Sequence, residues 1–274
     1  MKSYLILLGC IIILIFCFIY CKYKNNRDIE KFSNLSRKKI IAFSLWGNNE
    51  RYNWGAVENA LLAKELYPDW ICRFYVFKDI IPEVREKLES LNNVEVIVME
   101  KDKGAGNMFW RFIPMFEEDC EAVLSRDTDS RLNQREKDAV DLWLQQDKDL
   151  LILRDHPNHN QLIMGGMFGA KNNVFHQFRK EFEKNQKNDK MGKYFDDQIF
   201  LRDIYYQLKD NKLVFDAHHH FKDEKIQPFP QTDIKGYIGQ IVCKDFTLTN
   251  KKYGLDIKNT KVNKPYAIPK DSEI

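Results

Sequence analysis

Short apolar runs alternate with amphipathic stretches along the chain from Lys39 to Leu153. The expected strands and helices, in chain order, are Lys39–Leu45, Ala56–Tyr67, Arg73–Phe77, Pro82–Leu91, Val94–Val98, Met108–Phe116, Ala122–Ser125, Gln134–Gln146 and Leu150–Leu153. Repeated alternation of this kind is typical of a largely parallel sheet that helices cover on both faces. The sequence therefore predicts an α/β fold, in which ligands bind at the carboxyl ends of the strands.

The alternation becomes looser after Leu153. The features expected there are a Gly165–Gly166 turn, a helix at Val174–Lys184, a polar loop through Asn188, a helix at Asp196–Leu208 and a strand at Leu213–Phe215. Residues after Lys244 are rich in lysine and asparagine and lack periodicity, which predicts a surface segment. A chain of 274 residues has room for one α/β domain with a sizeable core and short appendages.

Charge and cysteine content exclude two classes of protein. The chain has 43 basic and 40 acidic residues, which are interleaved and leave a net charge of only +3. Nucleic acid is therefore not an expected partner, because its binders carry a basic stripe. The cysteines lie either in the apolar N-terminal stretch or far apart, at positions that match neither a disulfide framework nor a zinc site: Cys10, Cys17, Cys21, Cys72, Cys120 and Cys243.

The N-terminal stretch predicts a single membrane span that anchors the chain. Tyr4–Cys21 runs for 18 residues without a charge, near the lower limit for a helix that crosses ~30 Å of hydrocarbon. A cleaved signal peptide is the alternative, but such peptides end in small residues, whereas Phe18–Cys21 is bulky. The predicted plan is an anchor at residues 1–24, a polar stem at 25–38, one domain at 39–244 and a polar tail at 245–274.

The side of the membrane that the domain faces stays open. The flank after the span is more basic than the flank before it, which has Lys2 alone, and the positive-inside rule would then place the domain in the cytoplasm. The sequon at Asn34–Ser36 would instead be usable in the lumen. The expected localisation is therefore a single-pass membrane protein of undetermined orientation.

Two aspartates, Asp127 and Asp129, follow the fourth expected strand. In an extended segment, side chains at positions i and i+2 project to the same side. Carboxylate oxygens hold hard cations such as Mn²⁺ or Mg²⁺, which also bridge the phosphate oxygens of a substrate. The spacing therefore predicts a metal site at which the cation neutralises a diphosphate leaving group. A solvated turn is the alternative interpretation.

The motifs around these aspartates resemble those of glycosyltransferase-like proteins of the GT-A fold. They are Ser44–Gly47, Asn107–Phe112, Ser125–Leu132, Arg154–Pro157, Met164–Gly169 and Phe195–Gln198, and the similarity covers about Lys39 to Val242. The resemblance implies a Rossmann-like, mostly parallel sheet flanked by helices, a UDP- or GDP-sugar donor and a manganese-like metal. It leaves open the sugar and the acceptor, which would be a glycan, protein or lipid. Trp46 would be among the residues that contact the nucleotide-sugar.

Several polar residues near these motifs are candidates for holding the donor. The guanidinium groups of Arg111, Arg126 and Arg131 match phosphate oxygens bidentately, although each could instead pair with a nearby carboxylate. Asp155 and His156 follow another expected strand, so their side chains would enter the same crevice; a structural role is the alternative for His156.

Gly165 and Gly166 are further candidates, because glycines would let a sugar approach the backbone closely. An ordinary tight turn explains them equally simply. At Asp196 and Asp197, a helix start favours carboxylates, so capping would account for one of the two. The other is then available to take the proton of an acceptor hydroxyl in an inverting enzyme, whereas a retaining enzyme would not need this base.

A histidine cluster at residues 218–220 could supply a third metal ligand, as the resemblance implies. Imidazole tolerates manganese, and we expect one ligand, His219, because three consecutive histidines cannot all face one ion. The expected activity is metal-dependent transfer of a sugar from a nucleotide-diphosphate sugar (EC 2.4 type) to a carbohydrate or glycoconjugate acceptor. The alternative is a catalytically inactive sugar-binding or membrane-tethered structural protein that retains the fold. A phosphatase of the haloacid-dehalogenase type is disfavoured, because Arg131 holds the fifth place of the motif.

Overall fold

The computed structural model describes residues 37–187, 196–232 and 236–242. The span expected at Tyr4–Cys21, most of the stem, the polar loop around Asn188 and the tail after Lys244 lie outside these residues. Within the described part of the chain, no helix is both long and apolar enough to cross a membrane.

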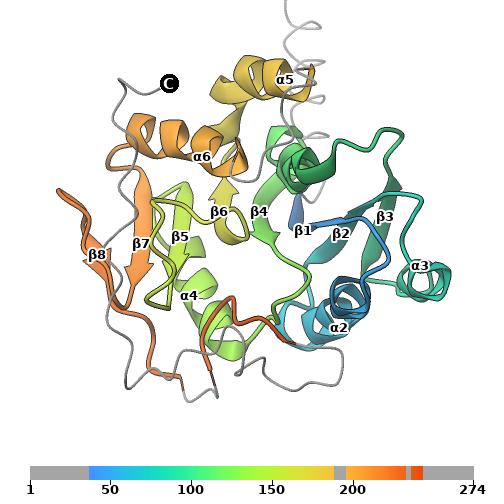
Figure 1. Cartoon of the computed structure of the whole chain (residues 1–274). Helices are drawn as coiled ribbons and strands as arrows, with labels where there is room; N and C mark the ends of the chain where they lie inside the picture. The colour runs from blue at the N-terminus through green and yellow to red at the C-terminus, as the bar shows by residue number, and fades with distance from the viewer. Residues whose placement is uncertain (1–36, 188–195, 233–235, 243–274) are drawn as a thin grey trace, which may run out of the picture. The chain divides into compact units, whose positions relative to one another are not determined.

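An eight-stranded sheet forms the centre of the fold (Figure 1). The strands are β1 (Lys38–Leu45), β2 (Ile71–Val76), β3 (Val94–Val98), β4 (Cys120–Arg126), β5 (Leu150–Arg154), β6 (Met167–Lys171), β7 (Lys212–Asp216) and β8 (Ile226–Gln227). Their order across the sheet is β3-β2-β1-β4-β6-β5-β7-β8. The pairings that β6 makes with β4 and β5 are antiparallel, and the other pairings between these strands are parallel. The prediction of a mostly parallel sheet flanked by helices is thus confirmed.

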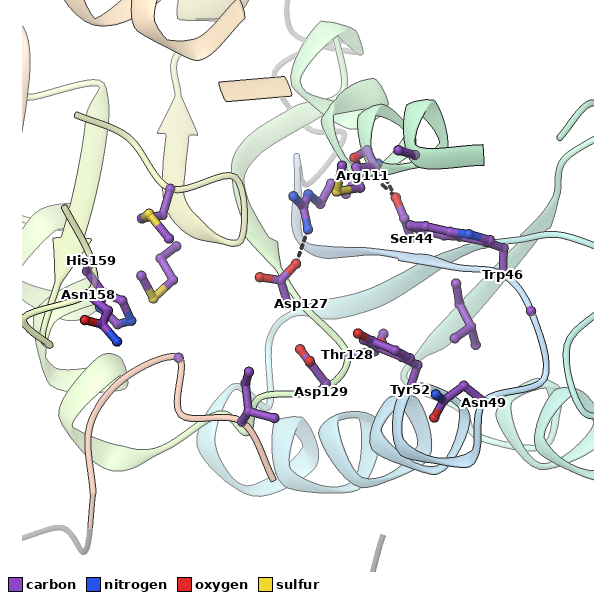
Figure 2. Close-up of a pocket in the computed structure, with 18 of the residues that line it drawn as sticks. Ser44, Trp46, Asn49, Tyr52, Arg111, Asp127, Thr128, Asp129, Asn158 and His159 are labelled. Atoms are coloured by element: carbon purple, nitrogen blue, oxygen red, sulfur yellow. Dashed lines mark hydrogen bonds and ion pairs between the residues drawn. The ribbon is translucent and has the colours of Figure 1, made fainter. Parts of the chain in front are cut away.

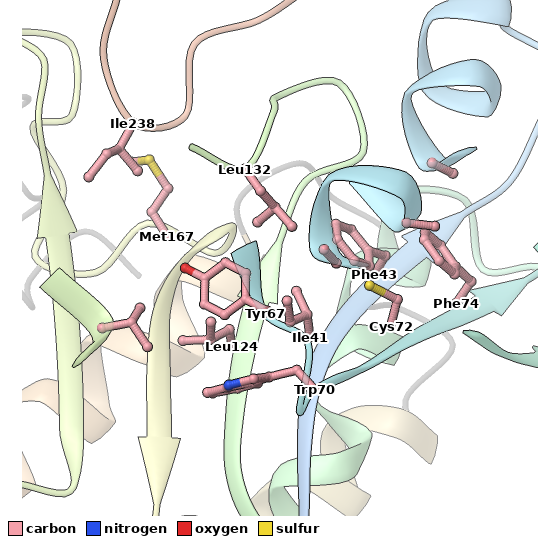
Figure 3. Packing of buried hydrophobic residues seen from close by; sticks show 14 of the residues in the cluster. Ile41, Phe43, Tyr67, Trp70, Cys72, Phe74, Leu124, Leu132, Met167 and Ile238 are labelled. Carbon is pink, nitrogen blue, oxygen red and sulfur yellow. The ribbon is translucent and has the colours of Figure 1, made fainter. Parts of the chain in front are cut away.

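Helices cover both faces of the sheet. They are α2 (Glu50–Leu66), α3 (Pro82–Glu89), α4 (Gln134–Leu144), α5 (Arg179–Lys187) and α6 (Asp196–Gln207), with 3-10 helices η1 (Gly104–Phe116) and η2 (Val174–Phe178). Side chains of a strand point alternately to opposite faces. In β1, Ile41 and Phe43 pack with α2, α3 and α4, whereas Ile40 and Ala42 pack with η1, η2, α5 and α6. Figure 3 shows the first of these two clusters, in which the ring of Phe43 stacks on that of Phe74 at 4.7 Å.

Local capping decides where the helices near the sheet edge begin. The side chain of Asn49 accepts a hydrogen bond from the amide of Arg51, so α2 begins at Glu50, six residues before the expected start at Ala56. Asn133 caps α4 in the same way, at the amide of Glu136. The earlier start of α2 brings its first turn to the carboxyl end of β1.

Strand β6 and the segment η1 differ from the expectation, as do strand β8, which the sequence does not predict, and the helix expected at Val174–Lys184, which is η2 followed by α5. The sequence predicts a turn at Gly165–Gly166 and no strand after it, but Met167–Lys171 forms strand β6 between β4 and β5. The aromatic segment expected as a helix at Met108–Phe116 is a 3-10 helix that begins at Gly104. Pro114 lies inside it and lacks an amide donor, which disfavours a regular α-helix there.

Candidate active site

A cavity of about 620 Å³ opens at the carboxyl ends of β1 and β4. Its lining comes from the end of β1 and the loop after it, from the start of α2, from η1, from the loops after β4 and β5, from the start of β6, and from the C-terminal segment 236–242. The lining residues are Ser44, Leu45, Trp46, Gly47, Asn49, Tyr52, Ala105, Met108, Arg111, Asp127, Thr128, Asp129, His156, Asn158, His159, Met164, Met167, Tyr237, Gly239 and Ile241. The cavity therefore lies where an α/β sheet is expected to bind its ligand.

Asp127 and Asp129 both line this cavity, as their spacing predicts (Figure 2). The side chain of Asp127 is about half exposed (48%), whereas that of Asp129 is 12% exposed. Burial, and then the negative charge of Asp127, raise the pKa of Asp129 to about 6, although Arg51 acts in the opposite direction. Arg51 Nη2 lies 3.6 Å from Asp129 Oδ2. An added cation would relieve this concentration of negative charge, so the two carboxylates fit a hard divalent metal.

Arg111 joins Asp127 to Asp197. Its buried guanidinium forms an ion pair with Asp127 and another, of 3.0 Å, with Asp197 Oδ2. Burial by itself lowers the pKa of Arg111, but the charges of Asp127 and Asp197 outweigh it and raise that pKa. Burial raises the pKa of Asp197 although Arg111 opposes the shift. Of the two predicted catalytic residues, Asp197 thus reaches the cluster through Arg111, whereas Asp196 is more exposed at the start of α6.

Gly165 and Gly166 lie against this charged cluster. A Cβ at Gly165 would be 2.4 Å from Asp197 Oδ2 and 2.5 Å from Arg111 Nη2. A Cβ at Gly166 would be 2.0 Å from Asp127 Oδ2. Their carbonyl oxygens accept hydrogen bonds from Ser125 Oγ (2.6 Å) and Arg126 Nη1 (2.7 Å), respectively. The two glycines therefore provide the space in which Asp127, Arg111 and Asp197 meet.

Arg126 and Arg131 make other contacts. Neighbouring strand residues face opposite sides, so Arg126 at the end of β4 points away from the cavity that Asp127 enters. Its Nε lies 3.1 Å from Glu136 Oε1, and both side chains are buried. Arg131 Nη1 donates to the carbonyl oxygens of Thr128 (3.1 Å) and Ser130 (3.2 Å). Neither residue is in the cavity lining. Arg126 pairs with a carboxylate, as the alternative interpretation has it, whereas the hydrogen bonds of Arg131 go to carbonyl oxygens of its own loop.

The residues expected after β5 divide between two roles. His156 lines the cavity, and its ring stacks on that of Tyr237 with 4.1 Å between centroids. Asp155 lies behind it, where Oδ1 accepts from Arg135 Nη2 (2.8 Å) and Oδ2 accepts from the amide of Ile238 (3.1 Å). Asp155 thus holds the C-terminal segment in place instead of lining the cavity.

His219 lies next to the loop after β5, outside the cavity lining. Its Nε2 is 2.8 Å from the carbonyl oxygen of Pro157, and its amide donates to Asp216 Oδ1. Among the described residues, the group of three possible metal ligands within 4.8 Å of one another is Glu117, Asp119 and Cys120, at the opposite end of β4. The role of His219 as a third ligand stays a prediction.

Several residues that line the cavity are not among the site residues that the sequence predicts. Ser44 accepts a hydrogen bond from the amide of Arg111 (3.1 Å) and so connects β1 to η1. Asn49 caps α2 and Tyr52 lies in its first turn, next to the end of β1. The rule that ligands bind at strand ends could have indicated both residues. His159 and Tyr237 gave no signal in the sequence, because they lie in segments without periodicity.

We expect the two cavity histidines to make the stability of the fold sensitive to acid. Burial, followed by the charges of His218 and His219, lowers the pKa of His156 to about 4, and burial lowers that of His159 well below 6.5. The unfolded chain binds these protons near pH 6.5, so the stability that the neutral rings provide is lost as pH falls from about 6.5 towards 4. We expect His156→Gln to reduce the fall in Tm between pH 7 and pH 5 by the equivalent of about 1–2 kcal/mol. Thermal unfolding of wild type, His156→Gln and the control His220→Gln at both pH values measures this; His220 is exposed. An equal fall in Tm between pH 7 and pH 5 in all three proteins would contradict the prediction.

Comparison with known proteins finds likeness in structure and none in sequence. No protein-family model matches the chain, and no curated protein matches it. The chain is similar to 4-diphosphocytidyl-2C-methyl-D-erythritol synthase from Anaerococcus prevotii, at 13% identity and a TM-score of 0.44 over 70% of this chain and 93% of that one. It is also similar to the galactosyltransferase LgtC in complex with donor and acceptor sugar analogues, at 16% identity and a TM-score of 0.42 over 65% and 73% of the two chains. A third similar structure is a glycosyltransferase involved in the glycosylation of the major capsid of PBCV-1, at 12% identity and a TM-score of 0.44 over 65% and 81%.

Proposed function

We propose that this protein is a metal-dependent glycosyltransferase that moves a sugar from a UDP- or GDP-sugar to an acceptor. The observation that carries the proposal is the pair of carboxylates, Asp127 and Asp129, in one cavity at the carboxyl edge of a mostly parallel sheet. Their mutual repulsion and the burial of Asp129 favour a cation between them. Asp127 and Asp129 would hold Mn²⁺ or Mg²⁺, which when bound neutralises the charge on a diphosphate leaving group.

The residues around the carboxylates suit the remaining parts of such a donor. The first turn of α2 reaches the cavity with Asn49 and Tyr52, and a helix N-terminus of this length favours a phosphate group. Arg111 carries a positive charge into the cavity and is held in place by Asp197. Trp46 offers a ring at the same end, where its edge packs against Trp110. In this arrangement Asp197 orients Arg111, and its role as the base for an acceptor hydroxyl stays a prediction.

Metal and nucleotide should bind cooperatively if the cation bridges Asp127, Asp129 and a diphosphate. We expect Mn²⁺ to tighten the binding of UDP or GDP at least about tenfold, which is a coupling of ~1.4 kcal/mol. By reciprocity, the nucleotide should tighten Mn²⁺ by the same factor. Isothermal titration calorimetry of each nucleotide with and without Mn²⁺ measures both terms. Uridine and guanosine are the matched controls, because they lack the diphosphate. If neither UDP nor GDP binds more tightly with Mn²⁺ than without it, the proposal is contradicted.

One observation favours a second candidate, a sugar-binding protein without transferase activity. The guanidinium of Arg111 already neutralises Asp127, as a metal would. In a protein that had lost catalysis, this ion pair would persist and the cavity would bind sugar without a metal. Release of nucleoside diphosphate from UDP- and GDP-sugars distinguishes the two candidates, because a binding protein should release none.

A further inference from the structure

The cavity has two sides, with the carboxylates between them. In Figure 2, Ser44, Trp46, Asn49 and Tyr52 lie to one side of Asp127 and Asp129, and Asn158 and His159 lie to the other. The first side is built from β1 and the start of α2, where the proposed nucleotide would bind. The second side lies away from the proposed nucleotide site.

Three rings form the surface of this second side, which we call the aromatic platform: His156, His159 and Tyr237. The rings of His156 and Tyr237 are stacked, with centroids 4.1 Å apart and planes 24° apart. His159 meets Tyr237 edge-on, at 5.6 Å and 66°. All three line the cavity, and both histidines are buried. Their mutual packing fixes the platform before any ligand arrives.

The segment that carries Tyr237 is anchored in the domain by the residues that follow Tyr237. Ile238 is fully buried in the core, and Figure 3 shows it next to Met167. Its amide donates to Asp155 Oδ2 (3.1 Å), and the amide of Val242 donates to the carbonyl oxygen of Asp129 (2.8 Å). The segment is thus tied both to the loop after β5 and to the loop that carries the metal candidates. Tyr237 is therefore a built part of the cavity wall.

The platform is apolar on its ring faces and uncharged at neutral pH. Burial lowers the pKa of both His156 and His159, so their rings are neutral above pH 7. Met164 and Met167 complete this side of the cavity, and the exposed amide of Asn158 offers hydrogen bonds beside it. The charged lining residues Arg111, Asp127 and Asp129 lie outside this group. Such a surface suits a ligand that has an apolar face, polar edges and no charge.

We propose that the aromatic platform binds a neutral pyranose ring, which is the acceptor of the transferred sugar. The C–H face of a pyranose is slightly positive and packs on the negative face of an aromatic ring. A sugar on Tyr237 would direct a hydroxyl towards Asp127 and Asp129, where the proposed donor ends. In the transfer, that hydroxyl oxygen bonds to the donor's anomeric carbon, the nucleoside diphosphate leaves with the electron pair of the broken bond, and the hydroxyl proton passes to solvent water. The identity of the pyranose as acceptor rests on the proposed function; its binding to the platform does not.

Saturation-transfer NMR on the full-length protein tests the binding directly. The probes are the methyl glycosides of glucose, galactose and mannose, with glucuronic acid as the charged comparison. At least one neutral glycoside should receive saturation through its C–H face. Tyr237→Ala should weaken that binding about five- to tenfold, because one stacking contact is lost, whereas Tyr237→Phe should retain it. Tyr206→Ala is the matched control, since Tyr206 is 56% exposed on α6 and outside the cavity.

A second measurement separates this inference from the proposed function. UDP and GDP titrations with Mn²⁺ should be the same for wild type, Tyr237→Ala and Tyr206→Ala, because Tyr237 lies across the carboxylates from the nucleotide side. If the glycoside binds through Tyr237 while the nucleotides show no dependence on Mn²⁺, the platform stands and the transferase proposal fails. Two results would overturn the inference. The first is that wild type and Tyr237→Ala bind the glycosides equally well, or that neither binds them. The second is that Tyr237→Ala loses the binding of nucleotides as well as that of glycosides.

Discussion

Replacing Asp129 with asparagine is expected to reduce sugar transfer at least about a hundredfold while the domain becomes slightly more stable. The variant keeps the shape of the side chain but removes one of the two negative charges that would hold the metal. In the metal-free protein the same charge is unfavourable, because it is largely buried and close to Asp127. Its removal should therefore raise Tm by roughly 2–4 °C, which corresponds to about 1 kcal/mol. Nucleoside diphosphate release from the donor and thermal unfolding without metal measure the two effects.

The opposite signs of these effects make the test specific. A residue that only supports the fold would lose activity and stability together. The matched control is Asp203→Asn on α6, where the aspartate side chain is 43% exposed and its contact with Arg202 is 3.8 Å long. This control should change neither quantity. Normal turnover in Asp129→Asn would remove the metal site from the proposed function, and a large fall in Tm would show that Asp129 is a structural residue.

The sheet could be predicted from the sequence wherever the chain repeats the β-α unit. Each strand from β1 to β5 is a short apolar run next to an amphipathic helix, so periodicity alone places it. Strand β6 could not be found in this way, because Met167–Lys171 is short, contains Gly169 and follows a glycine pair that reads as a turn. Strand β6 pairs with β4 and β5 in the antiparallel direction. This pairing is a tertiary contact of the folded sheet, so the local sequence does not report it.

The site residues that follow from a local sequence pattern could be predicted, whereas those that depend on tertiary contacts could not. Asp127 and Asp129 could be placed together because their spacing and the end of β4 are local features. Residue type alone could not show whether Arg126 binds phosphate or a carboxylate. Its side chain contacts Glu136 because neighbouring residues at the end of β4 point to opposite faces of the sheet. Tyr237 is distant in sequence from the other site residues, and it reaches the cavity through the burial of its neighbour Ile238. No pattern in a single sequence reports such a contact.

Replacing Gly166 with alanine is expected to disable the site with little cost to the fold. The new Cβ would lie 2.0 Å from Asp127 Oδ2, so the carboxylate must move by about 1 Å or more. The Asp127 side chain is short and half exposed, and Arg111 keeps its ion pair with Asp197 when Asp127 moves, so the movement costs little stability. A displacement of that size can nevertheless reduce catalysis about a hundredfold. We expect a similar loss of transfer and of Mn²⁺-dependent nucleotide binding, with a change in the free energy of unfolding below about 1 kcal/mol.

Gly169→Ala is the matched control, because it makes the same substitution three residues later and inside the core. There the Cβ would meet Leu124 Cδ2 at 2.8 Å and the ring of Trp143 at 3.1 Å, so the expected cost is about 1–3 kcal/mol of stability. The nucleotide affinity of the folded protein should be unchanged. We therefore expect opposite results at the two glycines. Gly166→Ala should lose activity and keep its stability, whereas Gly169→Ala should lose stability and keep its nucleotide affinity.

A double variant shows whether Gly166 acts through Asp127. If the alanine works only by displacing that carboxylate, adding Asp127→Ala to Gly166→Ala should cost nothing beyond Asp127→Ala alone, because the group that Cβ displaces is already absent. Additive losses would instead mean that Gly166 contacts the sugar donor by itself, as a close approach to the backbone requires. The cycle therefore decides between the two reasons for a glycine here, space for a carboxylate and space for a ligand. Calorimetry of UDP with Mn²⁺ on the four proteins measures it, and additivity would contradict the role assigned to Gly166.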